Sequence, residues 1–555
     1  MPARPRWTSL VARKSPSLVV GTLIVLVAAT TVSAQSQRVS ATASPQSEAV
    51  AGVFRLAQQE PPDPFEPATL SDNRTIELAQ NVFDSVTQVK ESNLTIAPGL
   101  ASRWTVSRGG TVYTFVLRRN ITFHDGRRLT AQDIVYSLNR ALNPSVKSQY
   151  AFFLSPIRGA NAVANGKAKV VSGVRALDSR RLQITLNQPT PYFPALASMW
   201  PYWVVDRNAV ERFGRKWTNP PNLNATGAFR LVSQVPDSKY VFEANSRYFL
   251  GKPRVNRVEV TIVPDPAAQL ARYRAGEFDV IQNLSAATYL QVQRDSQLSK
   301  QLHTKPILRT TWINMLNDKE PFDDVRVRRA FNRAIDKRAL VRVALGGLGA
   351  PSDTFLPPAM PGSVAATRRP TPFSPQAAQS LLSQAGFPDG DGFPNVVMIY
   401  QARADLQAVA EFVQSELKRN LGVEITLRPR PAKVFTNELN DPATRPLMAL
   451  WGFGLDYPDP QEQHEYLGVS GPTGFANYMN YKNPKFDTLV ARANRTVNVK
   501  TRARLHRQAE TVYLNDTPIV PLYNPIATWL AKPYVRGFTV TPLYMTRWTN
   551  VSVRQ

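Results

Sequence analysis

The clearest alternation of apolar and polar positions lies between residues 98 and 144. Within residues 112–118 every second side chain is large and apolar, and this period of two predicts a β-strand with one buried face. Gly126 then closes a His-Asp-Gly turn, because glycine adopts positive φ without steric cost. Thr130 is a suitable N-cap for a helix whose apolar residues recur at helical spacing up to Leu142. The block predicts two strands, a tight turn and a helix.

Strand and helix patterns mix along the rest of the chain, which favours an α/β (mixed α+β) fold. Further strands are expected at residues 53–57, 181–186, 229–232, 240–243, 255–263, 278–281, 396–400, 423–428 and 447–451. Further helices are expected at residues 75–86, 265–276, 374–385 and 406–420. No repeat of fixed period is visible, so the pattern excludes a solenoid or propeller.

The densest run of basic residues spans positions 325–342 and reads VRVRRAFNRAIDKRALVR. Its apolar positions recur at helical spacing, which predicts one amphipathic helix. Arg326, Arg329, Arg333 and Lys337 would project outward from that helix. We interpret the run as a solvated charged face.

The charge of the whole chain bears on its partners. The formal net charge is +26 over 555 residues, a balance that suits nucleic acid, a membrane surface or an anionic envelope polymer. Nucleic-acid binders concentrate basic residues on one element among aromatics, whereas Lys and Arg are spread along this chain, so no nucleic-acid partner is expected. A nonspecific envelope polyanion binder remains an alternative, and added salt would abolish its affinity.

Several kinds of chemistry are absent from the sequence. The chain has no cysteine, which excludes disulfides, thiol catalysis, Cys-ligated metals and acylation on an N-terminal Cys. The four histidines lack metal-ligand spacing, so neither a metal nor another cofactor is expected. HExxH, GxxxxGK and GxSxG motifs are also missing. The chain is therefore not expected to be an enzyme, with a hydrolase kept as a low-ranking alternative.

The N-terminus has the features of an export signal. Basic residues precede an apolar core at Leu18–Thr31, and Val32-Ser33-Ala34 provides small residues for cleavage before Gln35. We expect a signal peptide at 1–34 and a flexible tether at 35–52, with an uncleaved signal anchor as the alternative. The protein is thus expected in the periplasm or at the cell envelope.

Several segments resemble one protein family in the right order. The block at 98–144 is similar to the hallmark of the extracellular solute-binding proteins of family 5, the peptide/nickel-type receptors of ABC importers. Further matching segments are NATGAFRL, NSRYFLGKPRVNRVEVTIVPDPAAQLARYRAGEFDV, PFDDVRVRRAFNRAIDKRALV, NYMNYKNPKFDTLVARA and AETVYLNDTPIVPLYNP. Ala225 and Ala228 depart from the family pattern. The resemblance covers residues 53–545.

The resemblance implies a two-lobed periplasmic-binding-protein fold with a hinge and an extra inserted domain. Lobe I would comprise 53–87, 223–305 and 524–555, the extra domain 88–222, and lobe II 306–523. The implied function is capture of peptides outside the cytoplasmic membrane and delivery to a membrane permease by a monomeric carrier. Alternative solutes within the same family are an oligosaccharide, an opine, a metal chelate or haem.

Asp456 is the strongest candidate for ligand binding. The strand expected at 447–451 opens into the Gly- and Pro-rich sequence GFGLDYPDP. The resemblance implies that the first Asp after this strand forms a salt bridge to the α-ammonium group of a peptide, a charge-assisted bond. The alternative is that Asp456 caps a turn before Pro458. Asp459, just before Pro460, is assigned to turn chemistry.

The remaining site candidates are one arginine and three aromatic residues. Arg403 follows a strand end and matches the region where dipeptide-type receptors place a carboxylate-binding Arg; a solvated loop arginine is the alternative. Trp451, Phe453 and Tyr478 are expected to line a cleft, unless they belong to the core. His124 in the FHDG turn is expected to be structural.

Overall fold

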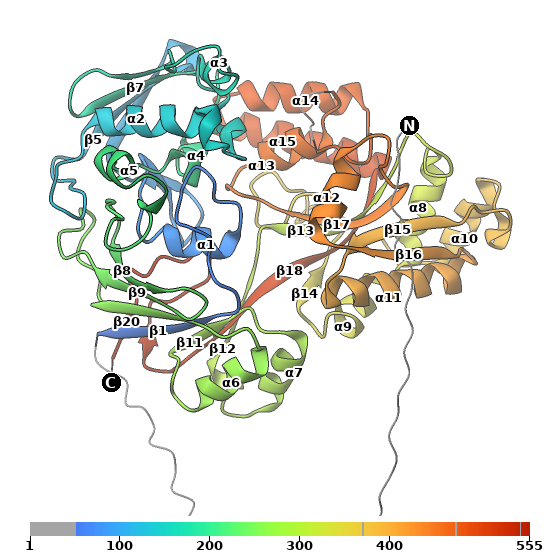
Figure 1. The fold of residues 1–555 in the computed structure, drawn as a ribbon. Coiled ribbons are helices and arrows are strands. Elements are labelled where there is room, and N and C mark those ends of the chain that lie inside the picture. The colour runs from blue at the N-terminus through green and yellow to red at the C-terminus, as the bar shows by residue number, and fades with distance from the viewer. Residues whose placement is uncertain (1–51, 369–370, 472–473, 475, 544, 555) are drawn as a thin grey trace, which may run out of the picture. The chain divides into compact units, whose positions relative to one another are not determined.

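The computed structural model describes residues 52–554, apart from 369–370, 472–473, 475 and 544 (Figure 1). The predicted signal peptide, and all but the last residue of the predicted tether, lie outside the described residues. Within the described part of the chain, no helix is both long and apolar enough to cross a membrane.

One mixed sheet of 12 strands runs through the described chain. Its strand order is β16 (Ile425–Arg430), β15 (Val396–Gln401), β17 (Met448–Gly454), β13 (Arg309–Met315), β18 (Ile519–Ala531), β11 (Val280–Gln282), β1 (Val53–Gln58), β10 (Arg257–Ile262), β9 (Lys239–Ala244) and β8 (Phe229–Val235). Two further strands, β12 (Leu302–Pro306) and β14 (Gly349–Pro351), also pair with β18. β18 therefore belongs to both halves of the sheet.

The two halves of the sheet form two lobes, which are joined by two neighbouring connections. The first part of β18 pairs with β13, and its last part pairs with β12 and β11. β12 leads into β13 through residues 307–308, so the β12–β13 segment is the second connection between the lobes and runs beside β18. Asn524 Nδ2 donates hydrogen bonds of 2.9 Å to Arg309 O and 2.9 Å to Thr310 Oγ1. The Asn524 amide thus ties one crossing strand to the other at a two-stranded hinge.

Lobe I is built on β11, β1, β10, β9 and β8, with α6 (Pro266–Arg274) and α7 (Ala286–Arg294) nearby (Figure 1). The C-terminal segment carries β19 (Val535–Arg536) and β20 (Ser552–Val553) back to this lobe. Trp548 is fully buried there, with ring-centroid distances of 5.7 Å to Phe229 and 5.1 Å to Phe242. The end of the chain thus completes the core that the first strand begins.

The helix predicted at 75–86 is wrong at its C-terminal end. The helix is α1 (Asn73–Ala79), and the chain turns after it. The side chains of Gln80 and Asn81 each donate a hydrogen bond to Thr546 O. Gly227 N donates to Val82 O at 2.8 Å, and a Cβ on Gly227 would lie 2.3 Å from the Val82 carbonyl. Contacts with distant segments override the local helical pattern here.

The second sheet confirms the strands, turn and helix predicted for the block at 98–144. Its order is β4 (Ala101–Ser107), β5 (Val112–Leu117), β7 (Arg181–Thr185) and β6 (Val174–Ala176). The elements around it are β2 (Thr87–Val89), β3 (Ile96–Pro98), α2 (Ala131–Leu142), α3 (Ala160–Ala164), α4 (Phe193–Leu196) and α5 (Arg207–Phe213). Thr130 N donates to Asp133 Oδ2 at 2.7 Å, half of a capping box. His124 is buried, and its Nε2 lies 3.0 Å from Gly227 O, so its structural role is confirmed.

Lobe II places helices on both faces of its half of the sheet. The helices are α8 (Val325–Ala334), α9 (Lys337–Val343), α10 (Pro375–Gln384), α11 (Ala404–Leu421), α12 (Ala432–Asn440), α13 (Pro460–Gln463), α14 (Pro484–Arg495) and α15 (Val499–Asp516). Ile313 and Met315 of β13 pack in one apolar cluster with α8, α10 and α11, whereas Trp312 packs in another with α12, α14 and α15. The two-residue period of the strand distributes its side chains between the two layers.

The single helix predicted at 325–342 is wrong, because the chain forms α8 and α9 with a break between them. Ile335 is extended, and the Asp336 side chain caps α9 by accepting from two backbone amides. Lys337 is buried rather than outward-facing and pairs with Asp353. Arg329 is exposed, as predicted.

Replacement of Trp548 by alanine tests the role of the C-terminal segment. We expect Trp548→Ala to lower the free energy of unfolding by about 3–5 kcal/mol, because it leaves a cavity against Phe229 and Phe242. Urea denaturation followed by fluorescence measures the change. Val343→Ala, at a position that is 67% exposed, should alter stability by less than about 0.5 kcal/mol. Equal effects of the two changes would contradict this account.

Candidate functional site

The two charged candidates, Asp456 and Arg403, lie at the edge of the lobe II sheet beside the hinge. β15 and β17 are parallel neighbours, so their carboxyl ends share one edge. Arg403 follows the end of β15 and Asp456 follows the end of β17, where β13 begins at Arg309. Ligands of α/β sheets commonly bind in crevices outside the carboxyl ends of strands. The two predicted charged residues thus lie at the edge that this rule favours.

Asp456 faces a second carboxylate, that of Glu462. Glu462 is fully buried, and its Oε2 accepts hydrogen bonds from Asp456 N at 2.9 Å and Tyr457 N at 3.3 Å. Among the described residues, no Lys or Arg forms an ion pair with either carboxylate. The half-buried Asp456 and the fully buried Glu462 therefore have no basic partner in the described part of the chain.

Burial changes the protonation of this acidic pair. Burial raises the pKa of Asp456 to about 6, while its hydrogen bond with Glu462 acts in the opposite direction. Burial and the negative charge of Asp456 raise the pKa of Glu462 well above its usual value. Near neutral pH the pair therefore retains a proton that it shares. A cation placed beside Asp456 would favour the fully ionised form.

Tyr150, between α2 and β6, lies within electrostatic range of the acidic pair and of Asp72, just before α1. Burial raises the pKa of Tyr150, and the charges of Asp456, Glu462 and Asp72 raise it further. Asp72 is the N-cap of α1, and its Oδ2 is buried without a hydrogen-bond partner. Arg74 Nε lies 3.4 Å from the other oxygen, Asp72 Oδ1. The negative charges of carboxylates before α1 and after β17 thus act on one phenol.

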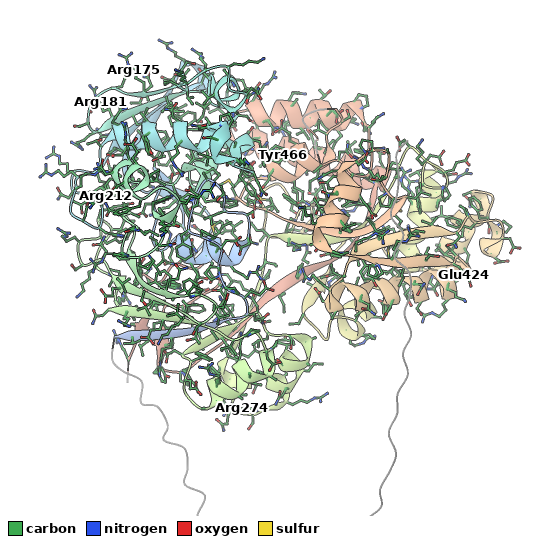
Figure 2. All side chains as sticks on the ribbon, viewed as in Figure 1. Arg175, Arg181, Arg212, Arg274, Glu424 and Tyr466 are labelled. Carbon is green, nitrogen blue, oxygen red and sulfur yellow. The ribbon has the colours of Figure 1, made fainter. Side chains whose placement is uncertain are left out.

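Aromatic contacts join the inserted domain to lobe II next to this acidic group. Phe153 lies 5.8 Å from Tyr457 and 6.2 Å from Tyr466 between ring centroids. Tyr466 also contacts Phe152 at 5.8 Å. Figure 2 shows Tyr466 where the blue-green and orange parts of the chain meet. These contacts close one side of the site with apolar surface.

The three predicted aromatic residues are brought together. The Trp451 ring centroid lies 5.0 Å from that of Tyr478 and 6.2 Å from that of Phe453. Trp451 and Phe453 are half-buried on the same face of β17. Tyr478 is buried, and its hydroxyl donates to Asn440 Oδ1 at 2.7 Å. The hydroxyl of Tyr478 is thus committed to the protein, while Trp451 and Phe453 keep accessible surface.

Arg403 stands apart from the other four candidates. Its side chain is 58% exposed and pairs with Asp405, with Nη2 to Oδ2 at 2.7 Å and Nε to Oδ1 at 3.0 Å. An exposed pair of this kind contributes little stability, so the guanidinium can exchange partners at small cost. The positive charge of Arg403 acts on Tyr523 of β18, which places it towards the hinge.

Sequence analysis missed Glu462, Tyr150 and Asp72. Glu462 lies six residues after Asp456, in the short helix that Asp459 caps by accepting from Gln461 N at 2.9 Å. That capping role confirms the turn chemistry assigned to Asp459, and its carboxylate also pairs with Arg502 at 2.7 Å. The sequence signal that could have indicated Glu462 is its position in a short helix directly after the loop that carries Asp456. Tyr150 and Asp72 carry no signal, because tertiary packing alone brings them near.

No metal centre is apparent among the residues that the structure describes. Within the described residues, no group of three or more His, Asp or Glu side chains is placed to hold an ion. The packing does bring two histidines together, with His464 Nδ1 3.1 Å from His506 Nδ1. Burial lowers the pKa of both rings well below the usual value, so both are neutral near pH 7. Their separation in sequence had not indicated this contact.

Replacing Glu462 with glutamine tests the acidic pair. A carboxyl whose pKa is raised by folding stabilises the folded state at low pH, and that contribution is lost as pH rises through the folded-state pKa. We therefore expect the stability of Glu462→Gln relative to the unmodified protein to rise by at least about 1 kcal/mol between pH 5 and pH 8. Urea denaturation at several pH values measures this difference.

The control for that experiment is Glu411→Gln, at an exposed position on α11. It should follow the pH profile of the unmodified protein. A stability difference between Glu462→Gln and the unmodified protein that stays constant across this pH range would rule out the raised pKa values of the pair.

Comparisons with known proteins place the geometry in context. The family model for bacterial extracellular solute-binding proteins, family 5, matches residues 95–475. The periplasmic murein peptide-binding protein MppA of Escherichia coli (strain K12) is 31% identical over 492 residues, with 86% of this chain and 89% of MppA covered. The probable deoxycholate-binding periplasmic protein YgiS of the same organism is 30% identical, with 88% and 90% covered. The unliganded open form of MppA superposes with a TM-score of 0.78 at 28% identity, covering 91% of this chain and 98% of that structure.

Proposed function

The chain belongs to the bacterial extracellular solute-binding proteins of family 5, and on that basis we propose that it captures peptides outside the cytoplasmic membrane for an ABC importer. The observation that carries the peptide assignment is the half-buried Asp456 beside the fully buried Glu462, with no basic partner among the described residues. A peptide supplies the missing cation through its α-ammonium group. MppA is named as a peptide-binding protein, which supports the same solute class.

The α-ammonium group would bind Asp456 and displace the shared proton. A charge-assisted hydrogen bond in a buried site is stronger than a neutral one, so the ligand offsets the cost of ionising the pair. Asp72 and Tyr150 would lie close enough to contribute to the same negative field. The peptide backbone would add strand-like hydrogen bonds at the edge of the sheet.

The other end of a short peptide would approach Arg403. The guanidinium fork suits a carboxylate, and its present partner Asp405 is exposed and replaceable. Trp451 and Phe453 would line a side-chain pocket, with Tyr478 as its fixed wall. A pocket of this kind is roomy enough to retain water and to accept different side chains.

Capture would proceed by closure of the lobes about the hinge at Asn524. We propose lobe boundaries at 305/306 and 523/524, because the crossing strands change partners there. We propose an inserted domain at 88–222, because this segment carries its own sheet of β4, β5, β7 and β6. The ligand would stabilise the closed form by the difference between its affinities for closed and open forms. The closed monomer would then deliver its solute to the permease, without catalysing a reaction itself.

A deoxycholate-type solute is the second candidate, because YgiS is named for it. The half-buried faces of Trp451 and Phe453 suit an apolar ring system. The acidic pair at Asp456 disfavours an anionic solute at the same place. Calorimetric titration of the purified protein with deoxycholate distinguishes the two solute classes.

Replacing Asp456 with asparagine tests the proposed ammonium site. We expect Asp456→Asn to weaken binding of a tripeptide with a free N-terminus about 10- to 100-fold, since the lost bond involves two charged groups and is worth roughly 1.5–3 kcal/mol. Isothermal titration calorimetry measures the affinity. In the unmodified protein the affinity should fall as pH drops below about 6, where Asp456 becomes protonated.

The N-acetylated form of the same tripeptide is the matched control. It lacks the ammonium charge, so it should bind weakly to both proteins and show no loss on Asp456→Asn. Unchanged affinity of the free tripeptide for Asp456→Asn would refute the ammonium assignment.

Replacing Arg403 with glutamine tests the carboxylate assignment separately. We expect Arg403→Gln to weaken binding of a free tripeptide about tenfold and to leave its C-terminal amide unaffected, because the amide offers no charge to the guanidinium. Competition titrations with both ligands give the two ratios. Equal losses for acid and amide would show that Arg403 acts on the structure of the site instead.

A further inference from the structure

A small cavity on lobe II gathers three arginine side chains. It has a volume of about 180 Å³ and lies where α8, the end of α15 and the segment before residue 369 meet. Arg329 and Arg333 reach it from α8, and Arg368 reaches it from that segment. The described residues that line it include no Asp or Glu. Three positive charges thus converge on a cavity with no acidic wall.

The charges of these arginines are not compensated by ion pairs. Within the described part of the chain, none of the three lies in an ion pair with a carboxylate. Arg329 Nη2 donates to Asn515 O at 2.8 Å, and Arg368 Nε is buried without a hydrogen-bond partner. By contrast Arg326, on the exposed side of the same helix α8, pairs with Asp324 at 2.6 Å. Of the α8 arginines, Arg326 is thus held in an ion pair, whereas Arg329 and Arg333, which line the cavity, form none with a described carboxylate.

Physical chemistry favours an anion in this position. Burial lowers the pKa of Arg368, and the charges of Asp353 and Glu510 oppose that shift only in part, so an anion in the cavity would stabilise its charged form further. Guanidinium groups bind phosphate through paired N–H donors in a fixed plane. The volume is below the roughly 300–1,000 Å³ of sites that enclose drug-sized ligands, which suits one phosphate group rather than a whole metabolite.

A second cavity continues the positive surface across Asn515. It has a volume of about 490 Å³ and is lined by Lys485 of α14 and by Arg504 and Arg507 of α15. Its described lining also contains no Asp or Glu. A membrane or another extended anion that entered the first cavity would therefore meet further cations next to it.

These cavities lie at the opposite end of the lobe II sheet from Asp456. Asn515 precedes the start of β18, where Ile519 pairs with the end of β13 at Asn314. Asp456 follows the other end, where Gly454 pairs with Arg309. The arginine cavity is therefore separate from the proposed peptide site.

We propose that Arg329, Arg333 and Arg368 form a binding site for a phosphate group, carried by free phosphate or by the headgroup of an anionic phospholipid. The proposal does not depend on which solute the lobes capture. It gives a function to a basic run that sequence analysis had interpreted as a solvated face.

The test removes two of the three charges and compares two sources of phosphate. Arg329→Gln/Arg333→Gln is the test variant of the full chain. Arg342→Gln/Lys433→Gln is the control, since it removes the same charge from exposed positions that line neither cavity. Calorimetry with inorganic phosphate and co-sedimentation with phosphatidylglycerol vesicles, against phosphatidylcholine vesicles, are done at about physiological ionic strength.

We expect the unmodified protein and the control to bind phosphate in one saturable event and the test variant to bind at least about tenfold more weakly. If the headgroup is the source, the phosphatidylglycerol vesicles bind more tightly than inorganic phosphate and show the same dependence on the two arginines. Arg333→Lys, which keeps the charge but loses the planar fork, should give an intermediate affinity and guards against misfolding of the double variant.

Two results would overturn the proposal. One is no saturable binding of inorganic phosphate or phosphatidylglycerol vesicles by the unmodified protein. The other is equal weakening in the test and control variants, which would assign the attraction to the net charge of +26 rather than to the cavity.

Discussion

β18 is the strand on which the arrangement of the molecule depends. Its 13 residues pair with β13 and β14 in one lobe and with β12 and β11 in the other. Because one strand serves both halves of the sheet, the lobes can move relative to each other only by bending at residues 307–308 and next to Asn524. The carboxyl ends of β15 and β17 lie beside that bend. The affinity for a solute bound at Asp456 would therefore depend on the angle between the lobes, and binding of that solute would shift the equilibrium between open and closed forms.

Uncompensated charge marks both ends of the lobe II sheet. At the hinge end, the half-buried Asp456 and the buried Glu462 form no ion pair with a described Lys or Arg. At the far end, Arg329 and Arg333 line a cavity whose described lining holds no Asp or Glu. At the hinge end, the burial of Glu462 beside Asp456 makes negative charge costly for the folded state. Such a cost is recovered when a ligand of opposite charge binds. Arg326, on the same helix as Arg329 and Arg333, is by contrast paired with Asp324.

The sequence predicts an element well where local physics decides its conformation. The strand at 112–117, the cap at Thr130 and the positive φ of Gly126 follow from spacing and turn chemistry, and all are present. The helix predicted at 75–86 ends early because Gly227 and the C-terminal segment take its backbone and side-chain partners. The helix predicted at 325–342 breaks because Asp336 caps a new one. Periodicity cannot show a partner that lies hundreds of residues away.

The same distinction explains why the segment most typical of the family says little about the solute. The His-Asp-Gly turn is recognisable because its backbone conformation restricts which residues can occupy it. His124 Nε2 contacts the backbone carbonyl of Gly227, so this atom is already engaged within the protein. The pKa of Asp456 depends instead on its burial and on Glu462, and packing between domains brings Tyr150 within range of the charges of both carboxylates. Changes in those neighbours would alter the charge that the cleft presents while leaving the turn intact. A carrier fold can thus change its solute without losing the segment that identifies it.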